Sequence, residues 1–186
     1  MPPRDISVLV MPIPACPELE AFRSTEMKKP TEILGPHVSI LGPFVPQDFT
    51  LPIIQGIAKV VATHASIGTL LEQFCVFADV PALYLSVYPV TPFEALRDAI
   101  LRVLPDHDPE FRGPTFHVTL AYGFDLGSLP ELMARAHAQL DAVVPLEIKL
   151  QEVVLFDRLG GNWTARETFR LWDDDDGTRP TGPNNL

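Results

Sequence analysis

Hydrophobic residues in this chain form short runs and periodic stretches that predict alternating strands and helices. Apolar runs rich in β-branched residues predict strands, whereas apolar residues spaced three or four positions apart predict helices. The predicted strands cover residues 6–11, 37–41, 70–80, 83–88, 116–122, 146–156 and 163–172. The predicted helices cover residues 18–29, 51–63, 91–104 and 128–143.

The order of these elements repeats within the chain. A helix and two strands follow the strand at residue 37, and the same order follows the strand at residue 117, which predicts an internal duplication. Prolines are frequent, 20 in 186 residues, but they lie between the elements and mark element ends rather than a linker. We therefore expect residues 1–172 to form one bilobal domain. Residues 173–186, with four Asp and one Arg, are expected to be an acidic, disordered tail.

The two equivalent strands carry the same polar pattern. HVSILGPF begins at His37, and HVTLAYGF begins 80 residues later at His117. Because side chains alternate across a strand, His37 and Ser39 share one face, and so do His117 and Thr119. The intervening apolar residues are expected to anchor each strand in the core. Each strand then offers an imidazole beside a hydroxyl to a shared cleft, provided that the two strands pack side by side.

Two histidines with two hydroxyls suit in-line displacement at a phosphodiester. A single His-Val-Thr sequence is usually structural, but two copies at equivalent positions favour a functional role. One imidazole can accept a proton from the attacking oxygen, the other can donate one to the leaving oxygen, and the hydroxyls can bond to phosphoryl oxygens. With ordinary pKa values near 6.5, the pair predicts a bell-shaped rate profile centred near neutrality. The sequence leaves open which histidine is the acid.

Other catalytic chemistries have weaker support in the sequence. The chain contains neither the HExxH motif nor the paired cysteines typical of zinc sites, and it has no GxSxG motif of a serine hydrolase. His64 and His137 fall in predicted helices and His107 in an acidic loop, so we expect all three to be solvated. We accordingly expect no metal and no cofactor.

Composition limits the partners and the compartment. The net charge of −10 disfavours extended nucleic-acid binding, which depends on many Lys and Arg contacts to phosphate, but allows a small anionic ligand. Each apolar run is interrupted before the roughly 18 residues that a membrane-spanning helix needs. Two isolated cysteines, Cys16 and Cys75, suggest a reducing compartment, and Pro12 and Pro14 interrupt the N-terminal apolar run, unlike an export signal. We expect a cytoplasmic monomer.

With these paired motifs, the chain resembles the 2H phosphoesterases, which include the 2′-5′ RNA ligase and cyclic nucleotide phosphodiesterase groups. The resemblance covers about residues 5–172, from the opening strand through both motifs to the closing NWTARETFRLW. It implies an α+β, duplicated two-lobed fold, with antiparallel sheets around a central groove and helices on the outside. It also implies metal-independent chemistry on 2′,3′-cyclic phosphates or related phosphodiesters. Some 2′-5′ RNA ligase relatives have an arginine shortly after the second motif's threonine, where this chain has Tyr122.

We therefore predict a phosphodiesterase with His37, Ser39, His117 and Thr119 as its catalytic residues, acting on a small nucleotide-like or RNA-end phosphodiester. Phe44 and Tyr122 follow the motifs and are candidates for stacking on a base. Lys28, Lys29 and Arg158 are weaker candidates for electrostatic assistance. Two alternatives remain: a 2′-5′ RNA ligase, which the acidic composition disfavours, and a non-catalytic phosphate- or nucleotide-binding module.

Overall fold

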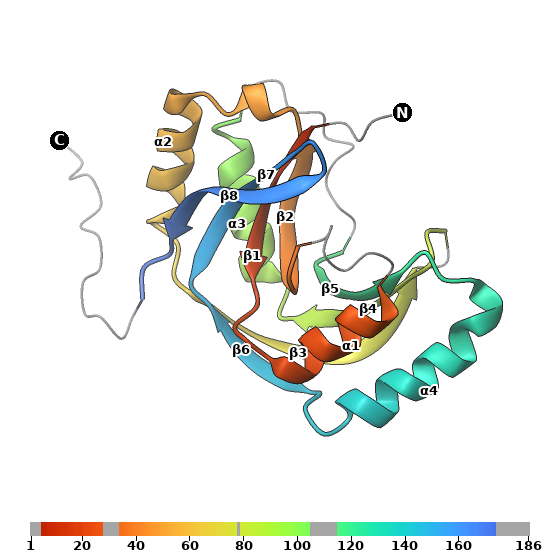
Figure 1. The fold of residues 1–186 in the computed structure, drawn as a ribbon. Helices are drawn as coiled ribbons and strands as arrows, with labels where there is room; N and C mark the ends of the chain where they lie inside the picture. Colours follow the sequence, from red (N-terminus) through yellow and green to blue (C-terminus); the bar gives the residue numbers. More distant parts are fainter. Residues whose placement is uncertain (1–4, 28–33, 78, 105–114, 174–186) are drawn as a thin grey trace.

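A computed structural model describes residues 5–27, 34–77, 79–104 and 115–173 (Figure 1). Its helices are α1 (Pro17–Glu26), α2 (Leu51–Val61), α3 (Thr91–Leu101) and α4 (Leu129–Leu140), with short 3-10 turns at Pro46–Asp48 and Leu126–Ser128. The strands are β1 (Ile6–Pro12), β2 (His37–Phe44), β3 (Ile67–Phe77), β4 (Ala82–Tyr88), β5 (His117–Tyr122), β6 (Leu146–Leu150), β7 (Glu152–Leu159) and β8 (Asn162–Arg170). All four predicted helices are present.

One predicted strand is wrong. Residues 146–156 do not form a single strand, because the chain leaves one part of the sheet after Leu150 and enters another at Glu152. Strand β6 pairs with β3, whereas β7 pairs with β1 and β8. Apolar and polar residues alternate up to Leu150, and apolar residues are continuous from Val153, with Gln151 and Glu152 between the two stretches. This change of pattern does not indicate which strands become the neighbours of each stretch.

The eight strands form one curled, antiparallel sheet in the order β6-β3-β4-β5-β2-β1-β7-β8. The motif strands β2 and β5 are neighbours at its centre, paired at Val38 and Val118. Each motif strand is thus the inner edge of a four-stranded half-sheet: β2-β1-β7-β8 is the first half-sheet, and β5-β4-β3-β6 is the second. The α+β fold expected from the resemblance is confirmed, and its two antiparallel sheets are joined edge to edge.

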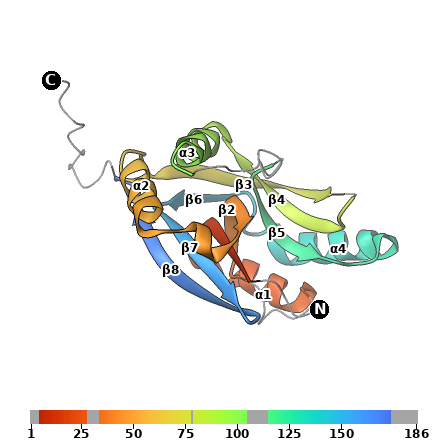
Figure 2. The same ribbon diagram turned by 90° about the horizontal axis from the view of Figure 1, so that it is seen from above.

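The duplication is visible as two equivalent segments, β1-α1-β2-α2 and β4-α3-β5-α4. The helices exchange sides: α1, which precedes β2, packs on β5, and α3, which precedes β5, packs on β2. Figure 2 shows the pair α2 and α3 separated by strands from the pair α1 and α4. The strand after α2 also crosses over, since β3 pairs with β4 of the second half-sheet. This exchange brings α1 to the junction between the motif strands.

The motif strands divide their side chains between core and surface as the alternation predicts. Val38 and Ile40 on β2, and Val118 and Leu120 on β5, are at most 3% exposed. They join one hydrophobic cluster with helix residues such as Phe22 and Phe93. The motif histidines and hydroxyl residues lie on the other face and keep solvent access. Among the described residues, no helix is long and apolar enough to span a membrane. Residues 174–186 of the predicted tail lie outside the described chain.

Candidate active site

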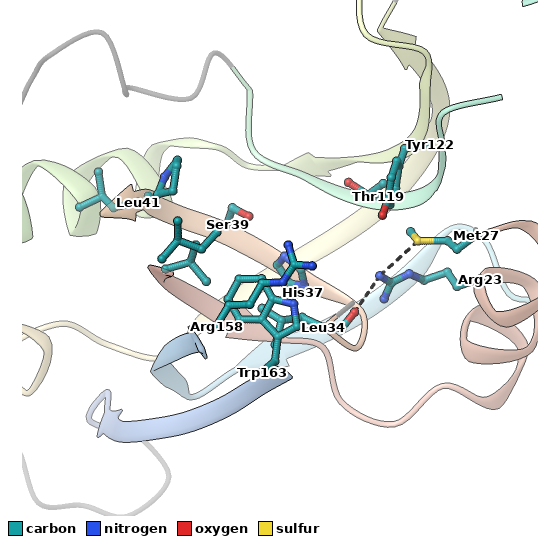
Figure 3. Close-up of a pocket in the computed structure, with 14 residues that line it drawn as sticks. Arg23, Met27, Leu34, His37, Ser39, Leu41, Thr119, Tyr122, Arg158 and Trp163 are labelled. Atoms are coloured by element: carbon teal, nitrogen blue, oxygen red, sulfur yellow. Dashed lines mark hydrogen bonds between the residues drawn. The ribbon is translucent and has the colours of Figure 1, made fainter. Parts of the chain in front are cut away.

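A cavity of about 430 Å³ opens over the junction between the two half-sheets. Its lining includes His37, Ser39, Thr119 and Tyr122 from the motif strands, with Arg23 from α1 and Trp163 from β8 (Figure 3). Residues from both halves of the chain therefore share one space. This arrangement places three of the four predicted catalytic residues around the same cavity.

The pairing of β2 with β5 sets the positions of all four motif residues. In an antiparallel pair, the residue after a paired position lies across from the residue before its partner. The Val38–Val118 pair therefore places His37 across from Thr119 and Ser39 across from His117. Each imidazole is adjacent to the hydroxyl residue of the other motif. This cross-strand arrangement follows from the antiparallel pairing of two copies of the same motif.

His37 has a defined orientation and tautomer. Its Nδ1 lies 2.7 Å from the carbonyl oxygen of Gly35, and because a carbonyl can only accept, Nδ1 carries the proton. The neutral ring therefore has a bare Nε2. Burial, together with the positive charges of Arg23 and His117, lowers the pKa of His37 to about 4 against the opposing effect of the Gly35 hydrogen bond. The imidazole is consequently neutral and able to accept a proton at neutral pH.

His117 repeats this arrangement. Its Nδ1 lies 2.7 Å from the carbonyl oxygen of Thr115, again two residues earlier, so its Nε2 is also bare when the ring is neutral. Burial lowers the pKa of His117, while the Thr115 hydrogen bond raises it. The ring packs edge-on against Phe77 and Tyr84, with centroids 5.0 and 5.1 Å away. His117 is not among the residues that line the cavity, although its charge acts on His37.

Ser39 and Thr119 both line the cavity. Ser39 is exposed and Thr119 is partly exposed. Within the described part of the chain, neither hydroxyl makes a side-chain hydrogen bond to another protein group. A hydroxyl without such a partner can donate to an anionic oxygen that enters the cavity.

The two predicted aromatic residues have different surroundings. Tyr122 lines the cavity and is 40% exposed, so its ring is accessible to a ligand. Phe44 packs edge-on against Phe49 at a centroid distance of 5.2 Å and is not among the lining residues. The geometry thus favours Tyr122 over Phe44 as a stacking residue.

The other polar candidates lie elsewhere or contribute less. His64 bonds to the Val60 carbonyl at 2.9 Å, and His137 pairs with Asp141 at 2.9 Å; neither lines the cavity. Arg158 does line it, with its guanidinium 5.9 Å from the centroid of the Trp163 ring. Lys28, Lys29 and His107 lie outside the described residues. Among the residues that are described, no group of three or more His, Cys, Asp or Glu side chains could hold a metal ion.

Arg23 is a charged lining residue that the sequence did not single out. It lies on the buried face of α1, one turn after Leu19, and is itself only 6% exposed. Pro17 at the first turn and the acidic residues Glu18 and Glu20 favour the start of this helix. An arginine at a helical spacing otherwise occupied by apolar residues was the available signal. Such a residue is expected either to be paired or to face a ligand.

Comparison with known proteins agrees with the fold. Residues 11–162 match the sequence profile of the 2′-5′ RNA ligase superfamily, whereas no curated protein matches the chain significantly in sequence. The crystal structure of TT0787 of Thermus thermophilus is similar at a TM-score of 0.56 and 15% identity, covering 89% of this chain and 97% of that one. E. coli LigT complexed with phosphate gives a TM-score of 0.52 and 12% identity over 92% and 99%. LigT complexed with 3′-AMP gives 0.53 and 12% over the same shares.

Proposed function

The chain belongs to the 2′-5′ RNA ligase superfamily, and on that premise we propose that it is a metal-independent phosphodiesterase. Its substrate would be a 2′,3′-cyclic phosphate or a related small, nucleotide-like phosphodiester. The observation that carries this proposal is the matched pair of histidines: in each, Nδ1–H is held by the carbonyl two residues earlier, which leaves Nε2 for chemistry. Two such groups on neighbouring strands can serve as base and acid in one displacement.

The proposed reaction is hydrolysis in a single in-line step. Nε2 of one neutral histidine takes a proton from a water molecule as the water oxygen forms a bond to phosphorus. The bond from phosphorus to one ribose oxygen breaks on the opposite side, and the other, protonated histidine donates its Nε2 proton to that oxygen. The hydroxyls of Ser39 and Thr119 donate hydrogen bonds to the non-bridging oxygens, where charge accumulates in the transition state.

The environments of the two histidines support an assignment of roles. His37 lies nearer to a positive charge, that of Arg23, and its pKa is lowered to about 4, so it is suited to be the base. His117 has a lowered pKa caused by burial alone, and it remains protonated more readily within the pair. We assign His37 as the base and His117 as the acid for ring opening. The complexes of LigT with phosphate and with 3′-AMP are consistent with a phosphoryl group in this fold.

Two alternatives use the same cavity. A 2′-5′ RNA ligase would have to bind RNA ends with a chain of net charge −10. It would also have Tyr122 where some 2′-5′ RNA ligase relatives have an arginine shortly after the second motif's threonine. A binding module would hold a phosphate or nucleotide without turning it over. The three functions differ in their product, so a product assay separates them.

The test measures hydrolysis of 2′,3′-cyclic AMP at several pH values, with and without EDTA. Replacing His37 or His117 with Ala is expected to lower the rate by about two to four orders of magnitude, since each change removes one general catalyst. The double variant should lose much less than the product of the single losses, because the histidines act as a unit. His64→Ala and His137→Ala are matched controls outside the cavity and should retain the wild-type rate.

Each alternative has a distinct result in this assay. Abolition of turnover by EDTA, or full activity of the His117→Ala variant, contradicts the paired-histidine mechanism. Binding of the cyclic nucleotide without any product across the pH range identifies a binding module. Joining of RNA ends with 2′-5′ linkages, together with no hydrolysis, identifies a ligase.

A further inference from the structure

Arg23 is a buried cation whose hydrogen bonds within the described chain go to neutral atoms. Its side chain donates to the Leu34 carbonyl at 3.0 Å and approaches Met27 Sδ at 4.0 Å. Its Nε is buried and has no hydrogen-bond partner among the described residues. A guanidinium has five N–H donors, so much of its capacity is unused here. In a residue only 6% exposed, this leaves a polar group that water cannot fully satisfy.

A buried guanidinium with unused donors lowers the stability of the fold, and a bound anion would offset this cost. Burial of a charge is unfavourable unless the charge is paired and hydrogen-bonded. Burial lowers the pKa of Arg23 to about 10, and the opposing effects of Glu20 and Tyr122 do not offset it. The residue still remains positively charged at neutral pH. The other buried residues of α1, Leu19 and Phe22, are apolar.

The side chain is directed toward the catalytic residues. Figure 3 shows Arg23 extending from α1 toward His37, with Thr119 and Tyr122 nearby. The charge of Arg23 is close enough to His37 to act on its ionisation, and Tyr122 acts on Arg23. The second arginine in the lining, Arg158, stacks over Trp163 and donates to the Gly161 carbonyl at 3.4 Å. Of the two arginines that line the cavity, Arg23 is the one whose charge acts on the ionisation of His37.

We propose that Arg23 is the phosphoryl anchor of this site, and that its guanidinium binds the non-bridging oxygens of the group held at His37 and Thr119. This inference rests on the proposed function for the identity of the substrate, but it predicts binding of any tetrahedral phosphate. A guanidinium suits this role because its planar fork donates two parallel hydrogen bonds to phosphate oxygens. The anchor comes from α1, outside both motifs.

The experiment measures the affinity of the full chain for inorganic phosphate by calorimetry, and KM and kcat for 2′,3′-cyclic AMP. The variants are Arg23→Met, which keeps the length of the side chain without its charge, and Arg23→Lys, which keeps the charge without the fork. Arg135→Met is the matched control. Arg135 is an exposed arginine on α4, outside the cavity, paired with Glu26 at 2.7 Å. Thermal melts verify that every variant is folded.

Arg23→Met is expected to weaken phosphate binding about 10- to 100-fold, the loss that corresponds to a charge-assisted hydrogen bond, and to raise KM similarly. Arg23→Lys should fall between Arg23→Met and the wild type. In a third variant, Arg23→Ala, millimolar guanidinium ion should restore part of the phosphate affinity, because it can occupy the vacated space. Arg135→Met should match the wild type.

The results separate this inference from the proposed function. Phosphate affinity in Arg23→Met equal to that in Arg135→Met, or a wild type that does not bind phosphate at millimolar concentration, overturns the anchor. A wild type that binds phosphate through Arg23 but yields no product overturns the proposed function and leaves the anchor in place. If Arg23→Met fails to fold, unchanged phosphate affinity in Arg23→Lys overturns the anchor, and weakened affinity with retained folding supports it.

Discussion

The pH dependence of kcat/KM for 2′,3′-cyclic AMP tests the electrostatics of the site directly, because it reports ionisations of the free enzyme. In the proposed mechanism, the productive form has His37 neutral and His117 protonated. The pKa of His37 is lowered to about 4 by burial and by its positive neighbours, and burial lowers the pKa of His117 from its usual value. The rate should therefore rise through about pH 4 and fall above a pH lower than 6.5. The optimum moves to acid from the neutrality that ordinary histidines would give.

The substrate complex should behave differently from the free enzyme. A bound phosphodiester places a negative charge beside both imidazoles, which favours their protonated forms. The bell-shaped profile of kcat should accordingly lie at higher pH than that of kcat/KM. Above the basic limb, kcat/KM should fall by about tenfold for each pH unit, since the fraction of protonated His117 declines in that proportion.

The assay follows initial rates from about pH 3.5 to 9 in buffers of constant ionic strength, at substrate concentrations below and above KM. In His37→Gln, the acid limb of the residual kcat/KM should disappear and the basic limb should remain. A kcat/KM profile with both limbs at or above pH 6.5 would refute the effect of burial on this pair. Loss of the basic limb in His37→Gln would instead reverse the assignment of acid and base.

Two further predictions concern stability. Leu120 on β5 is fully buried, so Leu120→Ala should lower the free energy of unfolding by about 2–5 kcal/mol. Thr119 faces the cavity, so Thr119→Ala should change it by about 0.5 kcal/mol. Equal losses in urea melts would mean that the faces of the strand are wrongly assigned. The pKa of His37 is about 4 when folded and ordinarily 6.5, so between these values the unfolded chain gains a proton that the folded chain does not, and stability falls as pH falls. The slope is at most about 1.4 kcal/mol per pH unit, reduced by partial solvent access, and His37→Gln should flatten it; an unchanged slope would contradict the linkage.

The sequence alone was sufficient for features that depend on local periodicity. Alternation along a strand placed Val118 and Leu120 in the core and Thr119 on the opposite face, and the structure confirms this division. It was also sufficient for the four helices, because apolar residues at helical spacing must bury one face. The repeated motif predicted that two strands would be equivalent. Each of these inferences needs only residues a few positions apart.

The features that the sequence missed depend on which segments pack together. The break between Leu150 and Glu152 is set by the separate pairings of β6 and β7. The polar pair Gln151 and Glu152 marks this position in the sequence, but it does not indicate which strands pair with either side. Phe44 and Tyr122 both follow their motifs, seven and five residues after the histidine, yet only Tyr122 lines the cavity, whereas Phe44 packs on Phe49.

The ionisation of the site was likewise decided by the tertiary structure. A pKa depends on exclusion of water and on nearby charges, and both arise when α1 crosses to pack on β5 and brings Arg23 to the cavity beside His37. Arg23 lies fourteen residues before His37 in the sequence, and no local pattern connects the two residues. The sequence determined which side chains lie on the polar face of each motif strand. Only the packing of distant segments determined which charge accompanies them and how readily each imidazole takes a proton.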